Sequence, residues 1–179
     1  VQVQERPLLL VHRLVARRRP HHRGLAELAG QFRLAGSEGI PAGPEHPMPK
    51  QELANYIPEF VEGIKAFACD KKIQYDIIHS HYWMSGIAAA SLSDGWAGLP
   101  IVHMFHTLGE MKNRIARTDE EREGVYRIEG ERQVLRRVDR VVVATIAELT
   151  QLRFLYKANA KKLVVIPPGV DVSHFYPIP

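Results

Sequence analysis

The chain has 179 residues, 45% of them hydrophobic, and a formal net charge of +4 at pH 7. This length and hydrophobic content are typical of one domain with a sizeable core. The single cysteine, Cys69, excludes a disulfide framework and any multi-cysteine metal site. The sequence contains no signal-peptide pattern and no apolar run of membrane-spanning length, so we expect a cytoplasmic protein without a membrane span.

The positive charge is concentrated at the N-terminal end of the chain. Residues 1–39 hold seven Arg, no Lys and three Glu, whereas residues 40–179 hold 17 basic and 17 acidic side chains. A nucleic-acid-binding domain usually spreads its cations over a folded face, often beside stacking aromatic rings. Residues 40–179 show no such stripe, and we therefore predict no nucleic-acid partner.

Residues 1–39 differ from the rest of the chain in composition and in pattern. Their basic residues are all arginine, and their apolar positions show no clear period. Two interpretations stay open, namely coding sequence translated from a wrong frame or start, and a poorly ordered basic tail. In both cases we expect the folded domain to comprise residues 40–179.

From residue 40 onward, short β-branched runs alternate with amphipathic stretches of helical length. This alternation is typical of βαβ units, and it predicts an α/β domain with a Rossmann-like parallel sheet and flanking helices. A first helical region spans Leu53 to Ala68, in which Pro58 starts or kinks a helix. The remaining expected elements, in chain order, are a strand at 75–79, a helix at 86–92, a strand at 101–105, a long polar loop, a helix at 127–138, a strand at 140–144, a helix at 147–156 and a strand at 162–166.

Polar motifs follow three of the predicted strands. Ligands of open α/β sheets bind beyond the carboxyl ends of the strands, so these motifs are the candidate site. His79 and His81 are two residues apart and would face the same side of a strand, which raises the question of a metal pair. No third ligand lies near them in the sequence, and we expect no metal. The three motifs are His79-Ser-His-Tyr-Trp83, His106-Thr107 and Pro167-Pro-Gly-Val-Asp171.

Five ordered segments of the chain carry a resemblance to a known family. They resemble family-4 glycosyltransferases of the GT-B fold, specifically the branch of sucrose-phosphate synthases and of the inositol-phosphate glycosyltransferase of mycothiol synthesis. The resemblance covers about residues 40–179, and as an ordered set the segments are highly specific. They are HSHYWMSG (79–86), FHTLGEMKN (105–113), YRIEGERQV (126–134), VVATIAEL (142–149) and VVIPPGVDVSHFYP (164–177).

The resemblance implies the acceptor-binding, N-terminal half of a two-domain retaining enzyme. That half is incomplete here, because the first strand and Gly-Gly loop of the family are not recognisable in residues 1–39. A nucleotide sugar, such as a UDP-sugar, would bind mainly to a second domain that is missing from this sequence. By the same resemblance no metal or other cofactor is expected, and Gly169 and Asp171 mark the entrance to the inter-domain linker, with Gly169 allowing close backbone approach.

The resemblance also assigns the candidate site residues. His106 would be the catalytic residue, lying near the reacting hydroxyl and the donor sugar and stabilising an oxocarbenium-like transition state. Two cations neutralise a phosphate dianion while two hydroxyls complete its hydrogen bonds, which points to a phosphorylated acceptor. The residues that match the acceptor-phosphate ligands of the family are Lys50, Tyr82, Thr107 and Arg127.

Two functions remain open at this point. The first is part of a retaining glycosyltransferase that moves a sugar from a nucleotide sugar to a sugar phosphate or inositol phosphate, without turnover as an isolated chain. The alternative is a non-catalytic module that binds a sugar phosphate or a partner protein. Titration with phosphorylated ligands, followed by a transfer assay, separates the two.

Overall fold

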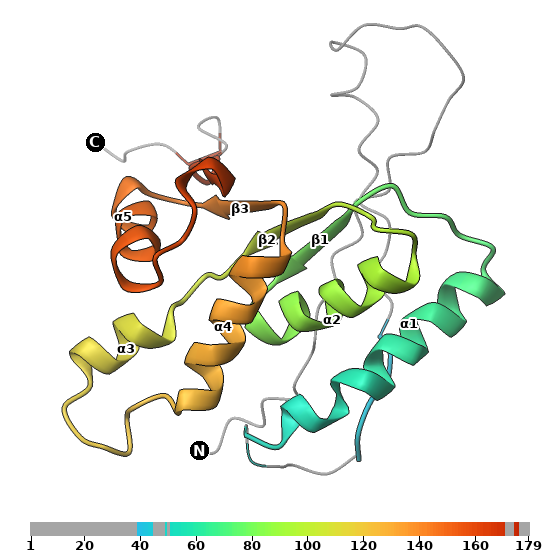
Figure 1. Ribbon diagram of the computed structural model, residues 1–179, viewed down its shortest axis with the longest axis horizontal. Coiled ribbons are helices and arrows are strands. Elements are labelled where there is room, and N and C mark those ends of the chain that lie inside the picture. The colour runs from blue at the N-terminus through green and yellow to red at the C-terminus, as the bar shows by residue number, and fades with distance from the viewer. Residues whose placement is uncertain (1–38, 45–48, 50, 171–173, 176–179) are drawn as a thin grey trace, which may run out of the picture.

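The computed structural model describes residues 39–44, 49, 51–170 and 174–175. The described strands form one parallel sheet in the order β1-β2-β3-β4, and each crossover between neighbours contains a helix (Figure 1). The predicted α/β class, with a Rossmann-like sheet and flanking helices, is therefore confirmed. The strands are β1 (Ile78–His81), β2 (Ile101–Met104), β3 (Arg140–Val143) and β4 (Leu163–Val165).

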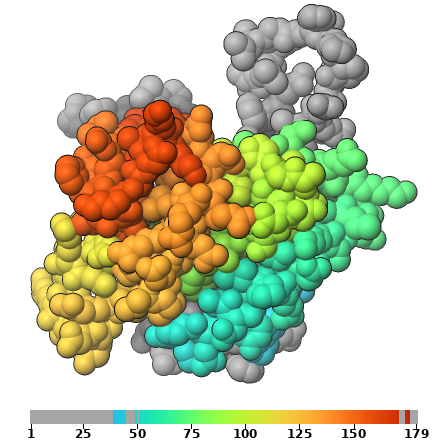
Figure 2. Space-filling view, viewed as in Figure 1, coloured from blue at the N-terminus to red at the C-terminus, as the bar shows by residue number. Residues whose placement is uncertain are grey.

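Helices α1, α2 and α4 form a layer in front of the sheet, and their side chains close over it (Figure 2). Pro58 lies in the first turn of α1, as predicted, because its fixed φ and missing N–H suit a helix start. In the part of the chain that the structure describes, no helix is long and apolar enough to cross a membrane. The helices are η1 (Leu53–Tyr56), α1 (Ile57–Asp70), α2 (Trp83–Gly95), α3 (Gly109–Ile115), α4 (Val125–Arg137), α5 (Ile146–Leu155) and η2 (Ala160–Lys162).

Two predicted elements differ from the structure. The first strand, expected at 75–79, begins only at Ile78, because a strand needs a paired neighbour and β2 begins opposite it at Ile101. His81, expected after the strand, is therefore its last residue. The polar loop expected after β2 contains helix α3, whose short polar sequence has no apolar period of its own. The other predicted elements agree with the structure within three residues at each end, and the first strand is displaced by three residues at its start and by two at its end.

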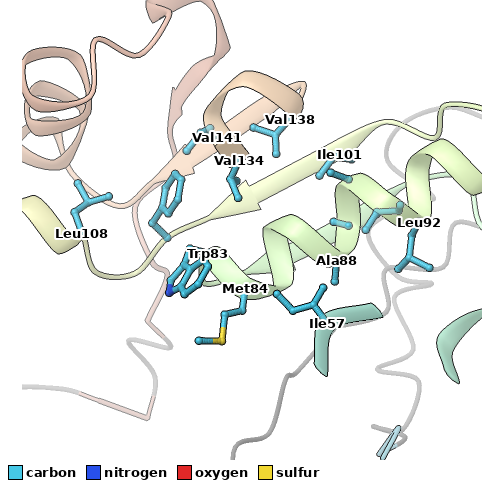
Figure 3. Close-up of a cluster of buried hydrophobic side chains, with 14 of the residues drawn as sticks. Ile57, Trp83, Met84, Ala88, Leu92, Ile101, Leu108, Val134, Val138 and Val141 are labelled. Atoms are coloured by element: carbon cyan, nitrogen blue, oxygen red, sulfur yellow. The ribbon is translucent and has the colours of Figure 1, made fainter. Parts of the chain in front are cut away.

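The hydrophobic core lies between the sheet and helices α1, α2 and α4 (Figure 3). Helix α2 supplies a run of small buried residues, Ala88 to Ala90, which lets it lie close to its neighbours. A Cβ on Gly130 of α4 would lie 2.4 Å from the ring of Trp83 in α2. The two helices can approach this closely only because glycine has no side chain.

Each strand buries alternate residues, which sorts the polar side chains of the sheet onto two faces. Ser80 and His103 point into the buried layer under the helices, whereas His79 and His81 are half-buried on the opposite face. This alternation follows from the two-residue period of a strand. The predicted placement of His79 and His81 on one face is confirmed, and their ring centroids are 4.3 Å apart.

Candidate functional site

The candidate site lies at the carboxyl edge of the sheet, where Tyr82 follows β1 and His106 and Thr107 follow β2. Tyr82 and His106 have positive backbone φ angles of 70° and 64°. Non-glycine residues rarely adopt such angles, and each instance costs on the order of 1–3 kcal/mol unless its surroundings hold it in place. Such strain is concentrated at functional sites in proteins. Here the strained backbone determines the direction in which the side chains of Tyr82 and His106 leave the main chain.

Arg127 reaches this edge from the first turns of α4, and its side chain is 0% exposed. Its Nη2 donates to the carbonyl oxygen of Thr107 at 3.1 Å and to the Thr107 hydroxyl at 3.0 Å. Its guanidinium carbon lies 5.2 Å from the centroid of the Tyr82 ring, a cation–π contact. The structure therefore brings together three of the predicted phosphate ligands, although they come from three separate segments.

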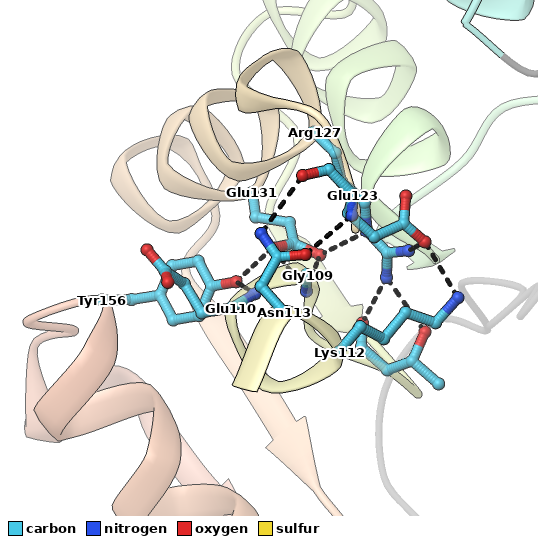
Figure 4. Close-up of polar contacts among 9 residues, drawn as sticks. Gly109, Glu110, Lys112, Asn113, Glu123, Arg127, Glu131 and Tyr156 are labelled. Atoms are coloured by element: carbon cyan, nitrogen blue, oxygen red, sulfur yellow. Dashed lines mark hydrogen bonds and ion pairs between the residues drawn. The ribbon is translucent and has the colours of Figure 1, made fainter. Parts of the chain in front are cut away.

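Glu131, one turn further along α4, is the buried counter-ion of Arg127. Its carboxylate accepts from Arg127 Nε at 3.0 Å, from the Gly109 N–H at 3.0 and 3.1 Å, and from the Tyr156 hydroxyl (Figure 4). Burial raises the pKa of Glu131, while the Tyr156 hydroxyl and Arg127 oppose that shift. Burial alone would lower the pKa of Arg127, but Tyr82, Glu131 and Glu123 outweigh it and raise that pKa.

A second carboxylate, from Glu123, also contacts Arg127. Glu123 lies just before α4, and its carboxylate accepts from Arg127 Nη1 and, at 2.8 Å, from Lys112 Nζ on α3 (Figure 4). The side chain of Asn113 holds the Glu123 backbone, accepting from its N–H at 2.7 Å and donating to its carbonyl oxygen at 3.1 Å. Two cations thus share one carboxylate beside Thr107.

His106, the predicted catalytic residue, is exposed and lies beside the histidines of β1. Its Nε2 is 2.7 Å from His81 Nδ1, so one of the two nitrogens donates a hydrogen bond to the other. The two rings stack with centroids 5.0 Å apart. In the described part of the chain no group of three His, Cys, Asp or Glu side chains could hold a metal ion. The contact with His81 fixes the orientation of the His106 ring at the carboxyl edge of the sheet.

His103 is a fourth histidine near this edge, but it faces the core. Its Nδ1 lies 2.8 Å from the Ser80 hydroxyl, and its Nε2 has no hydrogen-bond partner among the described residues. Burial lowers the pKa of His103 to about 3, with smaller contributions from the neighbouring histidines His81, His79 and His106. His103 is therefore neutral at pH 7 and supports the strand beneath the site.

The structure leaves some predicted residues untested and adds others. Lys50 and Asp171 lie outside the described residues. A Cβ on Gly169 would meet nothing within 4 Å, so the described residues make no close approach there of the kind predicted. Glu123, Arg127 and Glu131 follow one another at intervals of four residues, a helical spacing from which their ion pairs could have been predicted. No local pattern marks Lys112 as the partner of Glu123, Tyr156 as the partner of Glu131 or His81 as the partner of His106.

The fold and the site together define a class of protein. A parallel α/β sheet with flanking helices and with polar side chains at its carboxyl edge is a Rossmann-like domain. Residues 10–174 match the model of the family described as Glycosyltransferase Family 4, and the chain belongs to that family. The match begins within the Arg-rich segment 1–39.

Similar proteins agree with this assignment. The chain is 38% identical to the D-inositol 3-phosphate glycosyltransferase of Actinosynnema mirum over 154 residues, which cover 86% of this chain and 36% of that protein. It is 39% identical to the protein of the same name from Paenarthrobacter aurescens, over 77% of this chain and 34% of that one. The chain thus spans about a third of the length of these relatives.

A solved structure gives the same result for the fold. The structure of the sucrose-phosphate synthase of Thermosynechococcus elongatus superimposes on this chain with a TM-score of 0.66 and a sequence identity of 29%. The similarity covers 78% of this chain and 34% of that structure. The resemblance predicted from the five ordered motifs, to family-4 glycosyltransferases of the GT-B fold in this branch, is confirmed.

Proposed function

We propose that this chain forms the acceptor-binding part of a retaining glycosyltransferase that glycosylates a phosphorylated small molecule, with inositol phosphate as the first candidate. The observation that carries the proposal is the convergence of Tyr82, Thr107 and Arg127 at the carboxyl edge of β1 and β2. A planar guanidinium and two hydroxyls form a combination suited to phosphate. The names of the two relatives described above, which specify an inositol phosphate, support the choice of acceptor.

In this proposal the acceptor phosphate is held beside Thr107, and the acceptor hydroxyl points toward the donor. A nucleotide sugar, such as a UDP-sugar, is the co-substrate and binds mainly to a part of the longer enzyme that this sequence does not include. The leaving diphosphate departs on the face that the acceptor attacks and takes the proton of the acceptor hydroxyl. His106, oriented by its 2.7 Å contact with His81, contributes polar stabilisation near the reacting hydroxyl.

The proposal assigns no resident metal or other cofactor, and the cytoplasmic location stays a prediction. The 179-residue polypeptide corresponds to about a third of the relatives, so we expect it to bind the acceptor without transferring sugar. Measurable transfer from a UDP-sugar by the purified chain would contradict that part of the proposal.

Calorimetric titration with inositol phosphate tests the acceptor site. Thr107→Val keeps the side-chain shape but removes the hydroxyl, and we expect it to weaken binding about tenfold, which is the effect of losing one hydrogen bond to a charged group. Thr150→Val is the matched control, because the Thr150 hydroxyl bonds only within α5, to the carbonyl oxygen of Ile146. Equal binding by Thr107→Val and the control would contradict the proposed site.

Two further ligands complete the experiment. Uncharged inositol should bind far more weakly than inositol phosphate, because the proposed site recognises the phosphate. Fructose 6-phosphate tests the sucrose-phosphate synthase-like alternative for the acceptor. Phosphate-selective binding that never leads to transfer, even by the full-length enzyme with a range of nucleotide sugars, would favour a non-catalytic binding module instead.

A further inference from the structure

Arg127 is already neutralised in the structure, which raises the question of how it could hold an acceptor anion. Its Nε is paired with Glu131, its Nη1 with Glu123, and its Nη2 with Thr107. A second anion next to this set would meet two carboxylates at short range. An acceptor phosphate therefore requires one of the two glutamates to leave Arg127.

The two carboxylates differ sharply in how firmly they are held. Glu131 is 0% exposed and accepts hydrogen bonds from Arg127, from the Gly109 N–H and from Tyr156. Removing it would leave a buried cation without its partner, which is strongly unfavourable. Glu131 is thus a permanent part of the structure.

Glu123 is placed so that its carboxylate alone can move. Its side chain is 10% exposed, and Lys112, the second cation bound to it, is 44% exposed, so the position that they share opens to solvent. Asn113 holds the Glu123 backbone through both its N–H and its carbonyl oxygen, while the carboxylate pairs with Arg127 and Lys112. Rotation of the side chain would carry the carboxylate into water without unfolding the loop.

We propose that the carboxylate of Glu123 occupies the place of the acceptor phosphate, and that Lys112 is a further ligand of that phosphate. A carboxylate and a phosphate present similar oxygen acceptors to an Arg fork and a Lys ammonium. When phosphate enters, Glu123 turns outward, Arg127 Nη1 and Lys112 Nζ bind the phosphate oxygens, and Glu131 continues to hold Arg127 Nε. The inference rests on the proposed function and deepens it.

This arrangement makes Glu123 a specificity-determining residue. A ligand must compete with a carboxylate that is tethered beside the two cations, so a weakly charged anion binds poorly while a phosphate dianion can displace it. Before the acceptor binds, the same carboxylate balances the charge of Arg127, whose side chain is fully buried, and that of Lys112.

Titration of the purified chain with inorganic phosphate tests the inference. Glu123→Gln keeps the side-chain shape and removes the competing charge, and we expect it to bind phosphate about tenfold more tightly than the unmodified chain. Glu129→Gln is the matched control, because Glu129 is also a glutamate on the α4 segment paired with an arginine, Arg132, at 2.8 Å, but on the exposed side. We expect no change in phosphate affinity for the control.

Two results would overturn the inference. One is a phosphate affinity of Glu123→Gln within twofold of the unmodified chain, and the other is an equal gain by Glu129→Gln, which would indicate net charge alone. The double variant Glu123→Gln, Lys112→Gln should lose the gain, and retention of the full gain would exclude Lys112 as a ligand.

If Glu123→Gln does not give a cooperative thermal melt, Lys112→Gln in the otherwise unmodified chain provides the decisive comparison. We expect it to weaken phosphate binding at least threefold relative to Lys161→Gln, whose exposed side chain lies at η2; no difference would contradict the inference. Because inorganic phosphate contains no inositol, the expected gain together with no preference for inositol phosphate would retain this inference and reject the proposed acceptor.

Discussion

Arg127 is both a buried structural residue and a proposed ligand of the acceptor phosphate. It is fully buried and carries its charge because two carboxylates, Glu123 and Glu131, lie one turn away on either side. A buried ion pair of this kind adds little net stability, but breaking it costs several kcal/mol because it leaves a buried charge behind. Substitution of Arg127 itself would therefore confound binding with folding, whereas the exposed Thr107 tests binding with less risk to the fold.

His103 supplies a prediction about pH at the residue scale. Its pKa is about 3 in the folded chain and 6.5 in an ordinary environment. Between these two values the imidazole is protonated in the unfolded chain and neutral in the folded chain. The stability contributed by the neutral imidazole is present above pH 6.5 and is lost as the pH falls toward 3. We expect a loss of about 1.4 kcal/mol per pH unit in that range from this residue.

Urea unfolding at pH 7.5, 6, 5 and 4 measures this effect. His103→Asn retains a hydrogen-bonding group near the Ser80 hydroxyl but removes the titration. The variant will be less stable at every pH because of the smaller side chain, and its free energy of unfolding should fall less steeply with acidification. Parallel curves for the variant and the unmodified chain would show that His103 does not titrate on unfolding as expected.

At the scale of elements, the packing of α2 against α4 positions Tyr82 and Arg127 relative to each other. Tyr82 immediately precedes α2, and Arg127 lies in the first turn of α4. The contact between Gly130 and the buried ring of Trp83 sets the separation of the two helices. Any change in that separation moves the guanidinium relative to the Tyr82 ring.

We predict that Gly130→Ala destabilises the chain by about 1–3 kcal/mol, because the added methyl group would overlap the Trp83 ring. Chemical denaturation measures the loss. Gly95→Ala, at the end of α2, is the control, since its Cβ would meet only the flexible end of Lys65 at 3.1 Å and alanine favours a helix. A Gly130→Ala variant as stable as this control would contradict the close packing.

The elements also show what sequence patterns can and cannot predict. Helices α4 and α5 have ends within two residues of the prediction, and α5 has a local start signal in Thr145, whose side chain accepts from the Glu148 N–H. Helix α3 carries no such signal, since its first turn depends on Glu131, a residue 22 positions away that accepts from the Gly109 N–H. The predicted start of β1 is three residues too early for a similar reason, because pairing with β2 decides it.

At the scale of the whole molecule, one chain of hydrogen bonds joins the end of α5 to the candidate site. The Tyr156 hydroxyl, at the end of α5, accepts from the Glu110 N–H at 2.9 Å and donates to Glu131, which in turn holds Arg127. Burial raises the pKa of Tyr156, so the hydroxyl stays protonated and can donate. The connection between β3 and β4 thereby supports Arg127, which lies in the connection between β2 and β3.

We predict that Tyr156→Phe lowers the free energy of unfolding by about 1–2 kcal/mol, because it leaves a buried carboxylate with one donor fewer. Phosphate affinity should stay within twofold, since Tyr156 contacts Glu131 rather than the Nη atoms of Arg127. Tyr56→Phe is the control, because it removes the same hydroxyl group from a ring that packs against Gly43. Loss of phosphate binding in Tyr156→Phe without loss of stability would assign Tyr156 to binding itself.

The sequence by itself determined the fold class, the family and the candidate residues Tyr82, His106, Thr107 and Arg127. These are carried by local signals, namely the periods of helices and strands and the ordered motifs at the strand ends. Only the tertiary structure decided that Arg127 is buried between two glutamates and that Lys112 shares one of them. Charge balance in a buried site depends on which side chains meet through space, and residues brought together from α3, α4 and the loop between them have no common pattern along the chain.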